Sequence, residues 1–275
     1  MNNRVIGFCS TCVIVLSTVA LSACQTVQTT QGGTVGVGRT QRMVISAEEI
    51  NASAVQSYRE TLQEAASKGL LNRDAYQLNR VRGVANRLIP AAGAFRADSV
   101  RWGWEVNVIT SKDVNAWCMP GGKIAVYTGL IETLQLSDAE LAAVMGHEIA
   151  HALREHGREK ASQQAAQNAL IGVGAALLGL GEGVAGLANM AAQVTYGLPN
   201  SREFEREADR IGVELAARAG YDPFAAVSLW QKMGRVTGSG GLSFLSTHPS
   251  AADRLQELQN YAQQVMPLYR AAQRR

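Results

Sequence analysis

The sequence has few of the residues that mark several classes of protein. With 4 cysteines and 6 prolines in 275 residues, it is neither a disulfide-rich mini-domain nor a collagen-like repeat. The net charge is only +3 and no run of lysine and arginine exceeds two residues, so the basic surface typical of nucleic-acid-binding proteins is missing. Hydrophobic residues nevertheless make up 47% of the chain, which excludes an intrinsically disordered protein. The composition predicts a globular protein with a large core and no nucleic-acid partner.

The N-terminus resembles a bacterial lipoprotein signal. Arg4 supplies a positive charge, residues 5–20 are uncharged and largely apolar, and small residues then precede Cys24. In a lipobox of this kind, Cys24 becomes the lipidated first residue of the mature chain. Gln25 follows where inner-membrane lipoproteins usually carry Asp, so the resemblance favours sorting to the periplasmic face of the bacterial outer membrane. The alternative is an uncleaved N-terminal membrane helix, which the short apolar run disfavours.

Removal of a signal peptide over residues 1–23 would leave one free thiol. Two cysteines leave with the signal and the lipid blocks Cys24, so only Cys118 remains and no intramolecular disulfide is possible. The fold must then be held by its core, by a metal or by both. Residues 24–45 combine the anchor with a stretch rich in Thr, Gln and Gly that lacks hydrophobic periodicity, which we interpret as a flexible tether.

Residues 46–275 are predicted to form a single domain. Apolar residues recur with helical spacing over residues 46–90, with a break near Gly69. Residues 102–108 and 123–127 have the patterns of short strands. The rest of the chain is predominantly helical in pattern. The predicted fold class is therefore α+β, mostly helical, with a small β-sheet.

One predicted helix contains a His-Glu-x-x-His motif made of His147, Glu148 and His151. Its start is marked by a capping box, in which Ser137 is followed three residues later by Glu140. Residues four apart lie on one helix face, so both imidazoles can bind one zinc ion, and Glu148 can face the open coordination position. The alternative is a pair of surface histidines. The apolar neighbours disfavour it, because burying these groups without a partner would cost several kcal/mol.

A catalytic zinc site requires a third protein ligand. The helix predicted from Ser201 offers four acids, of which Glu205 and Asp209 share a face because they are four residues apart. One can bind the metal while the other accepts a hydrogen bond from a ligand histidine. Glu203 and Glu207 lie on other faces and could simply pair with neighbouring arginines. Spacing alone favours Glu205 only modestly over its acidic neighbours as the third metal ligand.

The two motifs together resemble the HtpX / CAAX-prenyl-protease family of zinc metallopeptidases, peptidase family M48, and in particular its periplasmic lipoprotein and mitochondrial Oma-type members. The resemblance spans about residues 115–254. It implies a zincin-like metallopeptidase domain with the sheet packed beside the zinc-binding helix, one Zn²⁺ per chain and Glu205 as the third ligand. It also implies that the segment beginning at Asn115 is an edge strand that holds the substrate backbone by β-addition.

His248 lies in a turn-like segment, six residues before Arg254. The resemblance implies that both border the cleft, where they stabilise the oxyanion or contact substrate, and preorganised donors suit that task. Two alternatives stay open: His248 binds the metal in a resting state, or it is a loop residue without a role. If His248 stabilises the oxyanion or contacts substrate, His248→Ala is expected to change turnover more than zinc content. His156, flanked by charged residues, is interpreted as a solvated residue at a helix end.

The segment between Lys160 and Arg202 has 41 residues and a single charge, Glu182. A buried hairpin, a membrane-touching segment and a lid over the cleft are all compatible with this composition. We favour a helical segment that packs on the domain or dips towards a membrane or an outer-membrane partner. Its longest clean apolar run is short for a membrane span.

These features predict a zinc-dependent endopeptidase in the bacterial envelope, with Glu148 as the general base. Its expected partners are protein or peptide substrates, namely misfolded or misassembled envelope proteins, the membrane through lipidated Cys24, and outer-membrane assembly machinery. The alternative function is a chaperone or assembly factor that retains the zinc fold. A purely structural zinc site is disfavoured, because no cysteine accompanies the histidines.

Overall fold

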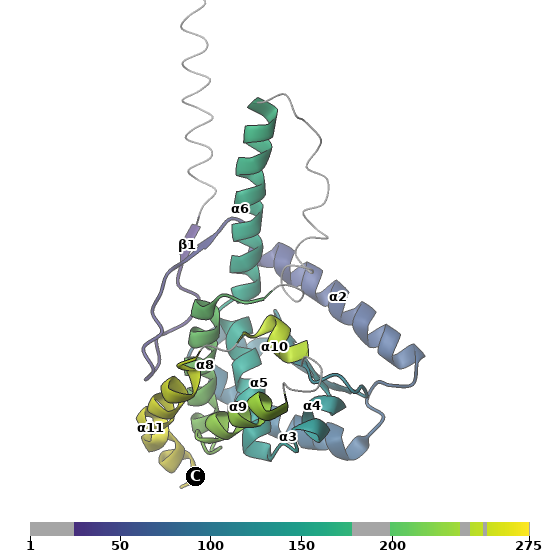
Figure 1. The fold of residues 1–275 in the computed structure, drawn as a ribbon, viewed down its shortest axis with the longest axis vertical. Coiled ribbons are helices and arrows are strands. Elements are labelled where there is room, and N and C mark those ends of the chain that lie inside the picture. The colour runs from purple at the N-terminus through teal and green to yellow at the C-terminus, as the bar shows by residue number, and fades with distance from the viewer. Residues whose placement is uncertain (1–24, 178–198, 237–242, 250–251, 275) are drawn as a thin grey trace, which may run out of the picture.

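The computed structural model describes residues 25–177, 199–236, 243–249 and 252–274 (Figure 1). Most helices and a small sheet form one packed body. The long helix α6 (His156–Leu177) rises from this body, and α2 (Ala47–Ser67) extends along one side of it. The signal peptide and Cys24 lie outside the described residues, so their predicted processing stays a prediction.

Two helices precede the sheet, where the sequence predicts them. The first, α2, begins at Ser46, which forms a capping box with Glu49. The second, α3 (Ala75–Ala92), begins after Asp74, whose side chain accepts a hydrogen bond from a backbone N–H in the first turn. The break between the helices lies at Gly69, which adopts a φ of 64°, a conformation that favours glycine.

The central sheet has three strands, β3 (Glu105–Ile109), β4 (Ala116–Met119) and β5 (Lys123–Tyr127), in the order β3-β5-β4. β5 pairs in parallel with β3 and antiparallel with β4. The turn before β5 contains Gly122, where a Cβ atom would lie 2.6 Å from the Trp104 ring. β4 is an edge strand of this sheet, as the family resemblance implies.

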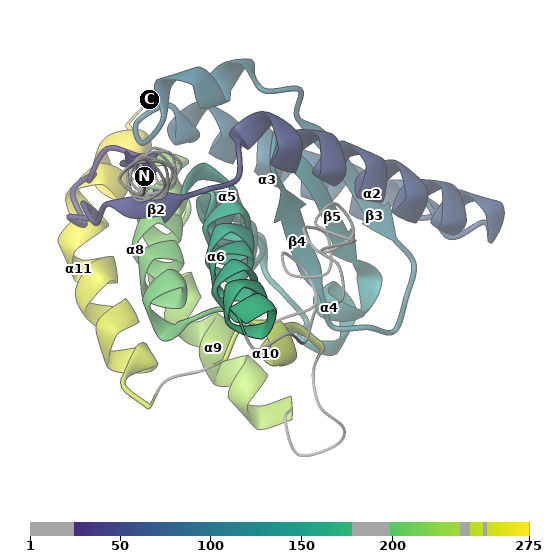
Figure 2. The same ribbon diagram turned by 90° about the horizontal axis from the view of Figure 1, so that it is seen from above.

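Helices cover both faces of the sheet, so the body has three layers (Figure 2). On one face, Tyr58 and Ala65 of α2 pack against Met119, Ala125 and neighbouring side chains. On the other face, buried residues of α3 and of α5 (Asp138–Leu153) join the main core cluster together with Ile124 and other sheet residues. This arrangement places the edge strand between α2 and α5.

The remaining elements complete the helical side of the body. Helix α8 (Arg202–Arg218) packs against α5, and α11 (Arg254–Ala272) packs against α8 and α9 (Ala225–Val236). The short helices are η1 (Ala97–Arg101), α4 (Thr128–Thr133) and α10 (Ser243–Thr247).

Two glycines allow α5 and α8 to approach each other at backbone distance. A Cβ atom on Gly146 of α5 would lie 2.8 Å from the carbonyl oxygen of Gly212 of α8. A Cβ atom on Gly212 would lie 2.8 Å from the backbone nitrogen of His147. A larger residue at either glycine would therefore move α5 and α8 apart, together with the side chains that they present to each other.

We expect Gly212→Ala to destabilise the protein by about 1–3 kcal/mol, because the new methyl group overpacks two backbones that cannot yield easily. The matched control is Gly83→Ala in α3, where a Cβ atom would meet nothing within 4 Å. There we expect no loss, and a gain of up to about 1 kcal/mol from helix propensity. Urea unfolding of both variants measures the difference, and equal stabilities would contradict the close approach.

The N-terminal segment is ordered, and the prediction of a flexible tether over residues 24–45 was wrong for the part that the structure describes. β1 (Gln25–Val27) pairs antiparallel with β2 (Gln41–Met43). Val35, Val37 and other side chains of the segment are buried in the domain. The physical reason lies in the tertiary structure. This stretch has no hydrophobic periodicity of its own, but it forms hydrogen bonds with polar groups of α6, α8 and Arg154, the residue after α5.

Helix α6 covers the start of the segment between Lys160 and Arg202. It follows Glu155, which adopts a φ of 52°, and its first turns pack on the domain, where Ala161 contacts Ile50. Residues 178–198 lie outside the described residues. Within the described part of the chain, no helix combines the length and the apolar character needed to cross a membrane.

Candidate metal centre

Helix α5 carries both histidines of the motif into the interior. It begins with the predicted capping box between Ser137 and Glu140. The side chains of His147 and Glu148 are buried, with 5% of each residue exposed. The Nε2 atoms of His147 and His151 lie 3.1 Å apart, so the two rings converge on one point.

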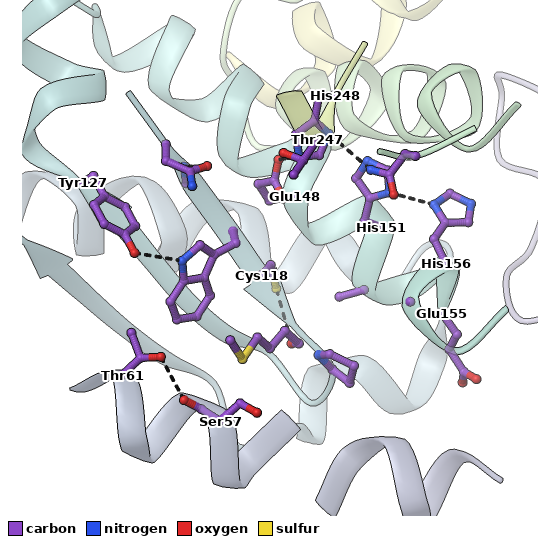
Figure 3. A pocket seen from close by; sticks show the side chains of 18 residues that line it. Ser57, Thr61, Cys118, Tyr127, Glu148, His151, Glu155, His156, Thr247 and His248 are labelled. Carbon is purple, nitrogen blue, oxygen red and sulfur yellow. Dashed lines mark hydrogen bonds and ion pairs between the residues drawn. The ribbon is translucent and has the colours of Figure 1, made fainter. Parts of the chain in front are cut away.

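Glu205 from α8 and His248, just after α10, join the two histidines in one buried cluster. A carboxylate oxygen of Glu205 lies 3.3 Å from Nε2 of His151, and its other oxygen lies 3.4 Å from Nε2 of His147. Nδ1 of His248 lies 3.2 Å from Nε2 of His147 and 3.0 Å from Oε1 of Glu205. Figure 3 shows His248 beside His151 and Glu148 at the end of the cleft.

These distances fit a tetrahedral zinc site. Zinc–ligand bonds of roughly 2.0–2.1 Å place neighbouring ligand atoms about 3.3 Å apart, which matches the separations within the cluster. Oε1 of Glu148 is buried and takes no hydrogen bond within the described part of the chain, and its neighbour in the cluster is Nε2 of His248, 3.4 Å away. Buried oxygens of this kind require a positive or proton-donating partner. The donor set of imidazoles and one carboxylate is one that zinc prefers.

Asp209 and Arg254 lie behind this cluster. Nδ1 of His147 lies 3.0 Å from Oδ1 of Asp209, the arrangement that orients a metal-binding histidine. Nη2 of Arg254 donates to the same Asp209 oxygen at 2.7 Å and lies 3.1 Å from Oε2 of Glu205. The guanidinium stacks on Trp230, 3.4 Å from its ring centre. Arg254 thus pairs with the carboxylates of Asp209 and Glu205 on the interior side of the cluster. It is not among the residues that line the cleft.

The interpretation of His156 as a solvated residue was wrong, because its side chain is buried with 1% of the residue exposed. Its Nδ1 lies 2.8 Å from Nδ1 of His151, and its Nε2 lies 2.9 Å from Oε2 of Glu207. Glu207 likewise differs from the expectation that it pairs with neighbouring arginines. It is buried and pairs with Arg154 and Arg39, which lie far from it in the sequence.

The charged groups of the cluster shift one another's protonation. Burial lowers the pKa of His147, but the carboxylates of Glu205 and Asp209 outweigh this effect and raise it to about 10. Burial raises the pKa of Glu205, but the neighbouring histidines pull it well below its ordinary value. Burial raises the pKa of Glu148. A metal that binds here must therefore displace a proton from His147.

A cleft of about 330 Å³ opens beside the cluster, between α2 and α5, and β4 runs along it. The carbonyl oxygen of Asn115 accepts a hydrogen bond from Tyr127 N of β5, so the alternation along the strand turns the backbone of Ala116 and Cys118 towards the outer edge of the sheet. Asn115 lines the cleft, and its Oδ1 accepts a hydrogen bond from Ala116 N. The cleft thus combines Glu148 and His151 with a strand edge that pairs with no further strand among the described residues.

Comparison with known proteins assigns the chain to a protein family. The model of peptidase family M48 matches residues 75–262, which is more than half of the chain and includes the whole cluster. The chain belongs to peptidase family M48. Membership confirms the family resemblance, the mostly helical zincin-like fold with its small sheet, and zinc as the metal that these residues are suited to bind.

Relatives of the chain come from mitochondria and from bacteria. It is 39% identical over 173 residues to the mitochondrial metalloendopeptidase OMA1 of Arabidopsis thaliana, which covers 62% of the chain and 34% of the relative. It is 33% identical over 210 residues to the same-named protein of Schizosaccharomyces pombe, covering 76% and 59%. It is 30% identical over 182 residues to the beta-barrel assembly-enhancing protease of Escherichia coli, covering 62% and 37%. The chain therefore spans less than two thirds of these relatives.

Sequence reasoning missed His156 and Glu207 as parts of this site. The available signal was spacing, since His156 follows His151 by five residues and Glu207 sits between Glu205 and Asp209. That signal is weak, because the break between α5 and α6 at Glu155 decides where His156 points. The contacts of both residues depend on the packing of three helices.

Proposed function

We propose that the protein is a zinc-dependent endopeptidase in which His147, His151 and Glu205 hold the metal and Glu148 is the general base. The observation that carries this proposal is the position of Glu148. Its buried carboxylate lies at the cluster, and its Oε1 accepts no hydrogen bond from a described residue. It also borders the cleft along β4, whose outer edge pairs with no other described strand. The metalloendopeptidase names of the Arabidopsis and fission yeast relatives support the same activity.

The chemistry divides between the metal and the chain. When bound, zinc supplies Lewis acidity towards a water molecule and towards the carbonyl group of the substrate. Glu148 takes a proton from the attacking water and delivers it to the leaving amine. Burial, which raises the pKa of Glu148, suits a group that must accept and return a proton near neutral pH. Asp209 holds the ring of His147, and Arg254 holds Asp209.

The substrate is proposed to bind as an extended segment along β4. The outward backbone groups of Ala116 and Cys118 can pair with such a segment by β-addition. Its side chains would then alternate between α5, which carries the cluster, and α2, which contributes Ser57 and Thr61 to the cleft wall. Asn115 is proposed to release Ala116 N when substrate binds.

We propose that His248 is a fourth metal ligand in a resting state and must leave before water can bind the metal, since its Nδ1 lies 3.2 Å from Nε2 of His147 and 3.0 Å from Oε1 of Glu205. Arg254, which the sequence paired with it, is instead proposed as a positioning residue. We expect His248→Ala to retain one zinc per chain, because three ligands remain, but to bind it about 10–100-fold more weakly. Competition with a chromophoric chelator measures the affinity. An affinity equal to that of the wild type would remove His248 from the ligand set.

The cellular role is also proposed. Lipidation at Cys24 would place the protein on the periplasmic face of the bacterial outer membrane, where misassembled envelope proteins are the substrates and the assembly machinery is a partner. The name of the E. coli relative, a beta-barrel assembly-enhancing protease, supports this assignment. Incorporation of labelled palmitate by the wild type and not by Cys24→Ser, followed by membrane fractionation, tests it.

Casein digestion by the purified protein tests the activity itself. We expect cleavage that a chelator abolishes and that added zinc restores. The alternative function, a chaperone or assembly factor, predicts that the protein binds unfolded clients and leaves them intact under both conditions.

A further inference from the structure

We infer that His156 and Glu207 position the metal ligand His151 through a chain of hydrogen bonds, so that one ligand of the site is held through a second imidazole. The inference rests on the proposed function, because it takes His151 as a metal ligand. All three side chains are largely withdrawn from solvent, and they come from α5, the start of α6 and α8.

The distances permit one arrangement of protons when a metal is bound. Nε2 of His151 faces the cluster and offers its lone pair, so the proton of the ring lies on Nδ1. This Nδ1–H donates to Nδ1 of His156, 2.8 Å away. His156 must then carry its own proton on Nε2, which lies 2.9 Å from Oε2 of Glu207 and donates to it. Each donor in the chain therefore meets one acceptor.

Glu207 is fixed in turn by two arginines. Arg154 donates to both of its carboxylate oxygens at 3.0 Å, and Arg39 does so at 3.0 and 3.1 Å. Arg39 also pairs with Glu159, which accepts a further hydrogen bond from Gln41. The ordered N-terminal segment thus contributes to the support of the metal site. Paired, well-oriented charges of this kind hold a buried carboxylate in one position.

The two histidines of the motif are supported differently. His147 donates directly to a carboxylate, that of Asp209. His151 reaches its carboxylate only through His156, whose ring also stacks on Phe204 with 4.4 Å between ring centres and 9° between planes. Groups that orient a metal ligand typically contribute 10–100-fold to metal affinity. We therefore assign His156 a positioning role beside its packing role.

Two substitutions separate these roles. His156→Phe keeps a ring that can stack on Phe204 but removes the acceptor for His151. His156→Asn keeps an acceptor near the Nδ1 position but removes the ring. We expect His156→Phe to weaken zinc binding by about 10–100-fold and His156→Asn to bind zinc more tightly than His156→Phe. Zinc affinity and the visible spectrum of the cobalt-substituted protein are the readouts, because both report the ligand and not only the fold.

The reverse order, or equal affinities in the two variants, would assign His156 to packing alone and overturn the inference. Failure of the proposed function has a different signature: the wild type would then bind no zinc, or would bind zinc and leave casein intact. A measurement on the zinc-loaded wild type needs no variant. In long-range ¹H–¹⁵N spectra, His156 is expected as the tautomer protonated on Nε2 and His151 as the tautomer protonated on Nδ1. A proton on Nδ1 of His156 contradicts the chain.

Discussion

Glu148→Gln is expected to reduce peptide hydrolysis by roughly 10²–10⁴-fold, the contribution of a positioned general base. Glutamine keeps the size and shape of the side chain but cannot accept and return a proton. Zinc content should stay at one per chain, because Glu148 is not one of the four clustered donors. Casein digestion and metal analysis of the same preparation measure the two quantities together.

The exposed Glu132→Gln provides the control, because it makes the same chemical change outside the site and should hydrolyse casein at the wild-type rate. If Glu148→Gln cleaves as fast as the wild type, Glu148 is not the base. If it loses zinc in proportion to activity, its role is structural and the proposed chemistry fails.

Substitutions along α8 should affect zinc affinity in a graded order. Glu205→Gln removes a charged ligand, so we expect the affinity to fall by more than the roughly 100-fold that loss of a supporting group can cause. Asp209→Asn should cost about 10–100-fold, because it weakens the support of His147. Glu203→Gln is the matched control, since this side chain is 62% exposed, pairs with Arg39 and is not part of the cluster.

Chelator competition at fixed pH gives the three affinities, and far-UV circular dichroism checks that each variant is folded. Zinc binding by Glu205→Gln equal to that by Glu203→Gln would exclude Glu205 as a ligand and require a different third donor. The pH must be held constant, because uptake of zinc displaces a proton from His147, whose pKa is raised to about 10. Binding therefore weakens as the pH falls.

Much of the centre was predictable because its geometry is local. A spacing of four residues places two side chains on one helix face wherever that helix lies in the fold. This rule paired His147 with His151, and Glu205 with Asp209, before any packing was known. Capping at Ser46 and Ser137 and the break at Gly69 are local in the same sense, and the structure contains all three.

The incorrect predictions concern residues whose surroundings depend on distant parts of the chain. Whether His156 is solvated depends on α8 lying against the start of α6, and Glu207 is buried because Arg39 reaches it from 168 positions earlier in the chain. The segment over residues 25–45 has no periodicity that would predict its order. Its strands and buried contacts exist only because α5, α6 and α8 present partners for them.

The amino-acid sequence alone placed His147, Glu148 and His151 together, since neighbouring turns of one helix set that placement, whereas spacing favoured Glu205 only modestly. Only the tertiary structure decided which groups support those residues. In the folded protein, Arg254 contacts the carboxylates of Glu205 and Asp209, His156 and Glu207 lie behind His151, and the N-terminal segment is ordered. The physical reason is that burial and charge pairing between distant segments depend on how the helices pack, and the close approach at Gly146 and Gly212 sets that packing.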